Sequence, residues 1–430
     1  MNVQELYNIF RQHPTVTTDT RDCPAGSIFF ALRGATFDGN AFALKALEAG
    51  CAYAIVDDSS VTGDDRLIHV DDTLKALQAL ATYHRHHFNG PVIQVTGTNG
   101  KTTTKELIAA VLGKKFKVLY TSGNFNNHIG VPKTLLRLTP EHDIAVIETG
   151  ANHPGEIASL SRIVDPDCGL ITNVGKAHLE GFGSFEGVIR TKGELYDYLR
   201  GKAGAFIFLN ADNPHLTGIV GDLKAVTYGQ TGRDYDVEGA VDSCTPYLNF
   251  RWRVKGGEWQ TVGTHLIGAY NIDNALAAAA VGSHFGVAPE VISQAIAAYE
   301  PTNNRSELKR TAHNTLIIDA YNANPTSMKA ALDNFRLISH SHKMAILGEM
   351  RELGAAEAEE HRRVVSGADT LGCEAVWLIG KAFAPYAAGH RYFENVEAAE
   401  SALREHPVEG RLILIKGSNG THLYRLPEYL

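Results

Sequence analysis

Closely spaced cysteines are absent from this 430-residue sequence. Its five cysteines are odd in number, lie far apart and include no Cys-x-x-Cys pair. Disulfide frameworks and zinc knuckles both need cysteines at short, regular spacings, so neither is indicated. A reducing compartment fits this cysteine usage best.

Long apolar runs and clusters of basic residues are also absent. No stretch reaches the roughly 20 apolar residues of a membrane span, and the start, MNVQELYNIF, is not a basic segment followed by an apolar one. The formal net charge is −8, and Lys and Arg form no stripe, which argues against nucleic-acid or anionic-membrane binding. We therefore expect a cytoplasmic monomer that binds its anionic ligands locally.

Length and composition indicate a globular protein of several domains. Hydrophobic residues make up 44% and charged residues 20% of the chain, close to the globular average. A chain of this length exceeds one ordinary hydrophobic core. We expect three domains, over residues 1–88, 89–302 and 303–430.

Short apolar segments alternate with helical patterns along most of the chain, which predicts an α/β fold. The central segment contains the predicted strands PVIQVTG, DIAVIETG, CGLITNVG and AFIFLNAD. The C-terminal segment contains TLIIDAY, KMAILGEM, AVWLIG and RLILIKGS. The N-terminal segment alternates similarly but is too short for a full doubly wound sheet. Parallel sheets bind ligands beyond the carboxyl ends of their strands, and polar residues follow these strands.

A histidine-rich tract, HRHH over residues 84–87, follows a helix expected over residues 73–83. The tract could bind a metal ion. A loop signal, Asn-Gly-Pro, comes directly afterwards, so a solvated helix end is the favoured interpretation.

The stretch VTGTNGKTTT, residues 95–104, resembles a phosphate-binding loop with unusual spacing. The general pattern G-x-x-x-x-G-K-[ST] would place a glycine at position 95, but Val95 stands there and the first glycine is Gly97. The stretch joins a predicted strand to a helix that begins at Lys101, and a helix N-terminus favours a bound anion. We predict that Lys101 contacts nucleotide phosphates and that Thr102 contacts Mg²⁺. A plain glycine turn is the alternative.

Two further residues are candidate magnesium ligands. Glu148 ends the strand DIAVIE, and His178 lies in the loop after CGLIT. Alone, the glutamate could cap a helix and the histidine could be a surface residue. Because parallel strands end at one edge of a sheet, both are expected near the phosphate loop, where a carboxylate and an imidazole could hold Mg²⁺.

Nine strings, in order and spacing, resemble the Mur ligase family over nearly the whole chain. They are TGTNGKTTT, GNFNNHIGVPKTLL, IETGANHPGEI, NVGKAHLEGFGS, TKGELYDYL, YNIDNALAAAA, IDAYNANPTSM, LGEMRELG and IKGS. In that family the shortened loop is normal. The resemblance implies a small N-terminal α/β domain that binds a uridine nucleotide, a central P-loop ATPase-like parallel sheet and a C-terminal Rossmann-like domain.

The resemblance also implies an ATP- and Mg²⁺-dependent ligase that forms an amide bond through an acyl phosphate. The opening TDTRDCPAGSIFFALRGATFDGNAF and the string DAYNANPTSM resemble the branch that adds D-alanyl-D-alanine to UDP-N-acetylmuramoyl-tripeptide in peptidoglycan precursor synthesis. Alternatives are the branch that adds the third peptide residue, whose D-N-P-R-type motif is missing here, and folylpolyglutamate synthase, which lacks a comparable uridine domain. A P-loop ATPase or switch that makes no bond is an alternative of another class.

Carried over position by position, the resemblance implies three groups of site residues. ATP would contact Thr98, Asn99, Gly100, Lys101, Thr102, Thr103, Asn271, Asn274, Arg305 and Asp319. Mg²⁺ would be held by Thr102, Glu148, His178 and Lys192, the last as a carbamate formed with CO₂. The uridine substrate and dipeptide would contact Asp19, Thr20, Arg21, Asn127, Asn322 and Asn324.

Catalysis itself is expected to depend on Lys101, Lys192, His178 and Arg305. Lys192 could instead be a surface lysine that pairs with a neighbouring carboxylate, and the YNANP string could simply be a capped turn. Three places differ from the family pattern: Tyr270 stands where histidine is common, Glu349 stands where aspartate is frequent, and Asn303-Asn304 precede Arg305 where a glycine is common.

Overall fold

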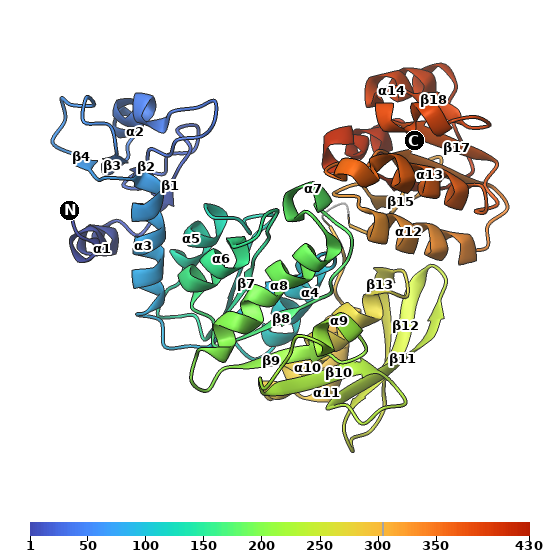
Figure 1. Ribbon diagram of the computed structural model, residues 1–430, viewed down its shortest axis with the longest axis horizontal. Coiled ribbons are helices and arrows are strands. Elements are labelled where there is room, and N and C mark those ends of the chain that lie inside the picture. The colour runs from blue at the N-terminus through green and yellow to red at the C-terminus, as the bar shows by residue number, and fades with distance from the viewer. Residues whose placement is uncertain (303–304) are drawn as a thin grey trace.

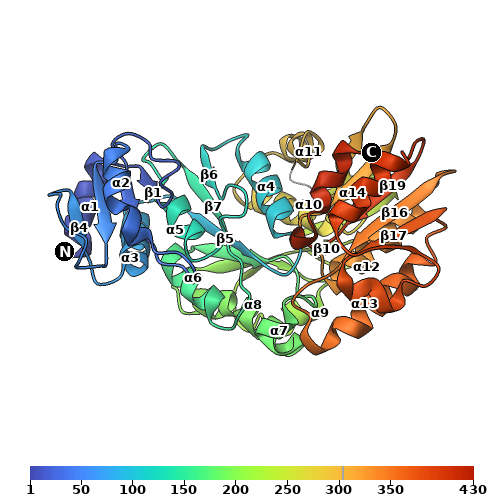
Figure 2. The same cartoon turned by 90° about the horizontal axis from the view of Figure 1, so that it is seen from above.

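The computed structural model describes residues 1–302 and 305–430 and contains three sheets, each within its own α/β domain (Figure 1). The N-terminal and C-terminal domains lie at opposite ends of the central one (Figure 2). The predicted α/β fold with three domains is confirmed. The predicted boundary at residues 302 and 303 adjoins residues 303–304, which lie outside the described residues.

The N-terminal domain has a small parallel sheet in the order β1-β2-β3-β4. Its strands are β1 Val16–Thr17, β2 Ile28–Phe30, β3 Tyr53–Val56 and β4 Leu67–His69. Its helices are α1 Val3–Gln12, α2 Ala43–Glu48 and α3 Thr73–Arg85. The α1 helix begins at a capping box, in which Asn2 and Glu5 each accept the other's backbone N–H.

Helix α3 ties the N-terminal domain to the central one. The buried Arg85 guanidinium donates to the Val164 and Asp165 carbonyls and to the Asp167 carboxylate, and His84 Nε2 lies 2.9 Å from the Leu138 carbonyl. The solvated helix end predicted for this tract is therefore wrong for the buried Arg85 and the half-buried His84, whereas His86 and His87 are exposed as predicted. No cluster of three or more metal-ligating side chains occurs in the described parts of the chain.

The central domain has nine strands in the order β13-β12-β11-β10-β9-β8-β5-β7-β6. They are β5 Val92–Thr96, β6 Val118–Tyr120, β7 Ile144–Glu148, β8 Cys168–Ile171, β9 Phe206–Asn210, β10 Ala225–Gln230, β11 Val237–Cys244, β12 Tyr247–Val254 and β13 Gln260–Ile267. The helices are α4 Lys101–Leu112, α5 Gly130–Leu135, α6 Glu156–Val164, α7 Leu179–Phe182, α8 Phe185–Arg200, α9 Pro214–Thr217, α10 Asn271–His284 and α11 Pro289–Ala297.

The predicted parallel sheet is correct from β6 to β11 but wrong at one edge. Strands β11, β12 and β13 pair antiparallel. In β12 the buried residues Leu248, Phe250 and Trp252 alternate with more exposed ones. Such alternation is typical of an antiparallel sheet with one face on the core, whereas parallel strands read as continuous apolar runs.

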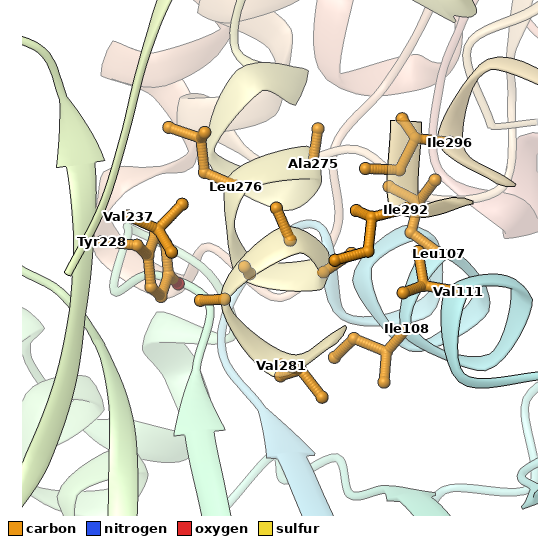
Figure 3. Packing of buried hydrophobic residues seen from close by; sticks show 14 of the residues in the cluster. Leu107, Ile108, Val111, Tyr228, Val237, Ala275, Leu276, Val281, Ile292 and Ile296 are labelled. Atoms are coloured by element: carbon orange, nitrogen blue, oxygen red, sulfur yellow. The ribbon is translucent and has the colours of Figure 1, made fainter. Parts of the chain in front are cut away.

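Helix α10 positions the phosphate loop through close packing against α4 (Figure 3). Its run of small residues, Ala275 and Ala277 to Ala280, is fully buried or nearly so. On one side Leu276 packs near the sheet, and on the other α4 and α11 contribute apolar residues. Alanine has no bulk beyond Cβ, so the two helix axes can approach closely and their N-termini lie together.

The C-terminal domain has six strands in the order β14-β15-β19-β16-β17-β18, all parallel except the β14–β15 pair. They are β14 Glu307–Arg310, β15 Thr315–Asp319, β16 Lys343–Gly348, β17 Ala375–Ile379, β18 Arg391–Phe393 and β19 Leu412–Lys416. The helices are α12 Pro325–Leu337, α13 Glu357–Ala368 and α14 Val396–Glu405. Among the described residues, no helix combines the length and apolar character needed to cross a membrane.

Candidate active site

The loop between β5 and α4 is built on two glycines with positive φ. Gly97 has φ of 145° and Gly100 has φ of 77°, and Gly100 is the residue directly before α4. A Cβ at Gly97 would overlap the Thr172 hydroxyl, and one at Gly100 would lie 2.5 Å from Asn274 Oδ1. Both positions therefore require glycine, for backbone conformation and for space.

Lys101 is folded over this loop. Its Nζ donates to the carbonyl oxygens of Gly97 and Thr98, each at 2.8 Å. Burial lowers the Lys101 pKa to about 8; Glu148 opposes the shift and Arg305 adds to it. A bound phosphate would favour the charged ammonium, so the loop is suited to an anion.

Glu148 lies beside the loop with one oxygen free. Its Oε1 accepts hydrogen bonds from Thr102 Oγ1 at 3.2 Å and Asn126 Nδ2 at 2.8 Å. Its Oε2 is buried and has no hydrogen-bond partner within residues 1–302 and 305–430. A buried, unpartnered carboxylate oxygen next to a threonine hydroxyl fits a hard divalent cation.

His178 lies at the start of α7 with φ of 49°, and its Nδ1 contacts the Glu352 carboxylate of the C-terminal domain. Burial lowers the His178 pKa; Glu352 opposes this, whereas Lys101 and Lys192 add to it. Burial thus favours the neutral imidazole, which is the form that binds a metal.

Lys192 is buried in α8, with only 2% of its surface exposed. Its Nζ lies 3.3 Å from the Ala151 carbonyl and 5.2 Å from the Phe182 ring centroid. The surface-lysine alternative is wrong, because Glu194 accepts two backbone N–H groups instead and Asp197 pairs with Arg200. Burial, and next the charge of Lys101, lower the Lys192 pKa to about 7.

A cavity of about 770 Å³ lies between the central and C-terminal domains. The predicted site residues that line it are Thr98, Asn99, Gly100, Lys101, Thr103, Asn127, Glu148, His178, Asn271, Asn274, Arg305, Asp319 and Asn322. Asn324 lines a second cavity of about 250 Å³, which also contacts His178. Thr102 and Lys192 are buried and line neither cavity.

The two α10 asparagines line the main cavity and also brace its wall. Asn271 Nδ2 donates to the Ile267 carbonyl, and Asn274 Nδ2 donates to Asn271 Oδ1, both at 2.8 Å. The Thr104 hydroxyl donates to Asn274 Oδ1. Between them lies Asp273, whose pKa is raised to about 6 by burial. Sequence reasoning did not identify Asp273 as a residue of this cavity.

The C-terminal domain brings Arg305 and Asp319 to the same cavity. The Arg305 guanidinium lies 3.7 Å from the Tyr321 ring centroid, and its Nε is buried without a hydrogen-bond partner in the described chain. Asp319 Oδ2 accepts from the buried Lys416 Nζ at 2.6 Å. Lys416 belongs to the IKGS string but was not predicted as a site residue.

The YNANP segment makes a capped turn and a domain contact together. Asn324 forms a capping box with Ser327 at the start of α12, so the capped-turn interpretation is correct. Its Nδ2 also donates to Asn99 Oδ1 at 2.7 Å, joining the C-terminal domain to the phosphate loop. Asn322 Oδ1 accepts the Ala323 backbone N–H.

The predicted uridine contacts lie apart from both cavities. Asp19 and Arg21 form an ion pair at 2.6 Å in the N-terminal domain, and hydrogen bonds from Arg21 lower the Asp19 pKa to about 2. Thr20 lies in the same loop. Lys133 of the central domain reaches the neighbouring Thr18 hydroxyl at 3.4 Å. Asn127 lines the main cavity, and its Oδ1 accepts the backbone N–H groups of Ile129 and Gly130 at the start of α5, the helix that carries Lys133.

Three sequence profiles of one family match the chain. They are described as "Mur ligase family, catalytic domain" over residues 14–85, "Mur ligase middle domain" over residues 95–282 and "Mur ligase, glutamate ligase domain" over residues 304–419. The chain belongs to the Mur ligase family. The family resemblance inferred from the nine strings is thus confirmed.

Relatives and solved structures of Mur ligases agree with this assignment. The chain is 39% identical to UDP-N-acetylmuramoyl-tripeptide--D-alanyl-D-alanine ligase of Bacillus subtilis, over 95% of this chain and 91% of that protein. It matches the crystal structure of MurF from Acinetobacter baumannii with a TM-score of 0.86 and 31% identity, covering 96% of this chain and 92% of that one. It matches MurF ligase from Thermotoga maritima in complex with ADP with a TM-score of 0.84 and 26% identity, covering 96% of both chains.

Proposed function

We propose that this Mur ligase joins D-alanyl-D-alanine to UDP-N-acetylmuramoyl-tripeptide at the expense of ATP. It is an enzyme that forms carbon–nitrogen bonds, as are its relatives named UDP-N-acetylmuramoyl-tripeptide--D-alanyl-D-alanine ligase. One observation carries the proposal: a cavity between two domains gathers a phosphate loop, a cation from the far domain and a carboxylate oxygen that has no hydrogen-bond partner among the described residues. That combination suits the transfer of a phosphoryl group to a second substrate held opposite ATP.

The first chemical step is the attack of the tripeptide carboxylate on the γ-phosphate of ATP, giving an acyl phosphate and ADP. Two anions must approach each other, and the cations Lys101 and Arg305 both face the cavity where they would meet. Preorganised positive charge stabilises the transferring group. The dipeptide amine then attacks the acyl carbon, and phosphate leaves as the amide forms.

Magnesium would be held by Thr102, Glu148, His178 and a carbamylated Lys192. Glu148 Oε2, which has no hydrogen-bond partner in the part of the chain that the structure describes, lies beside the Thr102 hydroxyl and supports this assignment. When bound, Mg²⁺ neutralises phosphate charge and orients the phosphoryl oxygens. The carbamate forms when the neutral Lys192 amine attacks CO₂ and releases one proton, and burial of that amine favours the neutral form.

Substrates at the two ends of the molecule would be held by different domains. We assign Asp19, Thr20 and Arg21 to the uridine nucleotide, and Asn322 and Asn324 to the incoming dipeptide. Asn324 already contacts the phosphate loop, so dipeptide and ATP sites adjoin. The domain limits 1–88, 89–302 and 303–430, the monomeric state and the cytoplasmic location remain predictions.

Phosphate release tests the function directly. We expect release from ATP only when UDP-N-acetylmuramoyl-tripeptide and D-alanyl-D-alanine are both present, with one new amide per phosphate by mass spectrometry. ATP hydrolysis without either substrate would instead favour a P-loop switch. Ligation of a diamino acid to UDP-N-acetylmuramoyl-dipeptide would instead favour the Mur ligase that adds the third peptide residue. Assays with UDP-N-acetylmuramoyl-tripeptides that end in diaminopimelate or in lysine show which tripeptide the enzyme uses.

Arg305→Ala is expected to lower kcat by about 10²-fold while changing the ATP dissociation constant much less, because the guanidinium approaches the nucleotide from the far domain. Asp319→Ala should behave similarly, since Lys416 then loses its partner. Arg310→Ala, an exposed residue of β14, is the matched control. Steady-state kinetics and calorimetric ATP titration measure both quantities. Unaltered kcat and KM in both variants would mean that domain closure does not bring these residues to ATP.

A further inference from the structure

The segment after β16 carries an unusual backbone residue. Glu352 has φ of 60°, a left-handed conformation that a residue with a side chain seldom adopts. Its Oε2 contacts His178 Nδ1, and its carbonyl oxygen accepts the Glu180 backbone N–H at 3.3 Å. The side chain and the backbone of Glu352 therefore both join the C-terminal domain to the α7 region of the central domain.

The Glu352 contact determines which ring nitrogen of His178 is available to bind a metal ion. A carboxylate accepts only, so Nδ1 of a neutral His178 carries the proton and Nε2 keeps its lone pair. His178 lines the main cavity together with Lys101 and Glu148. In a metal-binding histidine, a carboxylate that accepts from the nitrogen not bound to the metal orients the ring and raises the basicity of the ligating nitrogen.

The segment from Glu349 to Glu352 is itself held from within the C-terminal domain. The fully buried His361 accepts the Met350 backbone N–H at its Nε2, 3.0 Å away, and its Nδ1 lies 2.8 Å from the Glu357 carbonyl. Arg351 donates to the Gly420 carbonyl at 2.9 Å. The Glu352 carboxylate is thus presented by a braced turn, so its position depends on where the C-terminal domain lies.

A second bridge supports docking of the same two regions. Lys176, two residues before His178, pairs with the buried Glu360 of α13 at 3.1 Å. The Lys176 backbone N–H also donates to the Thr326 hydroxyl of α12. The central-domain segment that carries His178 is therefore contacted by three separate elements of the C-terminal domain.

We propose that Glu352 is a positioning residue: when the C-terminal domain closes, its carboxylate fixes the His178 ring with Nε2 toward the divalent-cation site. Metal affinity at that site then depends on domain closure, which couples ATP binding to assembly of the complete site. This inference rests on the proposed magnesium role of His178. It assigns Glu352 no contact with substrate.

Binding of Mn²⁺ in the presence of β,γ-methylene-ATP tests the proposal without relying on turnover. Titrations of the full chain, followed by the electron paramagnetic resonance of free Mn²⁺, give the metal affinity. We expect Glu352→Ala to weaken Mn²⁺ binding by about 10- to 100-fold, as for other residues that support a metal ligand. Glu352→Gln, which keeps an acceptor but loses the charge, should lie between. Glu357→Gln, an exposed carboxylate at the start of α13, is the charge-matched control and should bind Mn²⁺ normally.

A double-mutant cycle with His178→Ala separates positioning from general damage. If Glu352 acts through His178, the double variant should bind Mn²⁺ no more weakly than His178→Ala alone. Because the Glu352 side chain is 51% exposed, its replacement should leave the melting temperature nearly unchanged. Additive losses, or unaltered Mn²⁺ affinity in Glu352→Ala, would overturn the proposal. If the double-mutant cycle gives the expected result but the wild-type protein does not join the dipeptide to the UDP-tripeptide, the proposed function is overturned and the role of Glu352 stands.

Discussion

Lys101→Ala is expected to lower kcat/KM for ATP by about 10³-fold, because loss of one preorganised donor to a transition-state oxyanion costs about 10²- to 10³-fold and this donor is also a cation. Among the described residues, its Nζ donates hydrogen bonds only to the loop carbonyls of Gly97 and Thr98. Those contacts are replaceable by water, so the fold should persist. Steady-state kinetics at saturating UDP-tripeptide and dipeptide, with circular dichroism of both proteins, measure the two effects.

Lys114→Ala provides the matched control for that result. Lys114 is an exposed lysine just beyond the other end of α4, so its loss changes the net charge equally without touching the cavity. It should retain full activity. Undiminished turnover of Lys101→Ala at saturating ATP would contradict the assignment of VTGTNGKTTT as the phosphate loop.

Adjacency within one parallel sheet was predictable from the sequence. Strands β5 and β7 pair in parallel, so the residues after their carboxyl ends must lie together whatever else the chain does. The Thr102–Glu148 hydrogen bond follows from that rule. The phosphate loop and the Glu148 carboxylate beside it could therefore be placed from local patterns alone.

Contacts between domains were not predictable in this way. Asn99–Asn324, His178–Glu352 and Lys176–Glu360 join segments that no local periodicity relates. They depend on how two separately folded units dock. Glu352 lies within the LGEMRELG string, so the family resemblance marked its neighbourhood but gave it no role.

Burial was the other missing quantity. Arg85 lies in a tract predicted to be a solvated helix end, and Lys192 could have been a surface lysine, yet Arg85 is 5% and Lys192 is 2% exposed. A long charged side chain can be buried when its head group finds hydrogen-bond partners, as Arg85 does, or when burial lowers its pKa toward neutrality, as for Lys192. Sequence alone distinguishes neither case from a solvated lysine or arginine.

Burial of Lys192 makes carbamylation chemically accessible. The reaction consumes the neutral amine and CO₂ and yields an anionic carbamate and a proton. With a pKa of about 7 the amine is largely protonated at pH 6 and largely neutral at pH 8, whereas an ordinary lysine stays charged at both. The wild-type enzyme should therefore gain activity as pH rises through about 7. Added bicarbonate should stimulate that activity most below pH 7.

Lys192→Ala is accordingly expected to lose about 10²-fold or more in kcat, because the metal site would lack one oxygen ligand. Acetate or formate should partly restore activity by placing a carboxylate in the space that the side chain leaves, and ammonium salts or methylamine should not. Lys224→Ala, an exposed lysine just before β10, should be fully active and indifferent to both additions. Intact-protein mass spectrometry is unsuited to a labile carbamate, so ¹³C NMR with labelled bicarbonate provides the direct observation. Rescue by amines instead of carboxylates would mean that the site uses the buried ammonium itself. An alanine variant that keeps full activity would mean that Lys192 only fills space beneath Phe182.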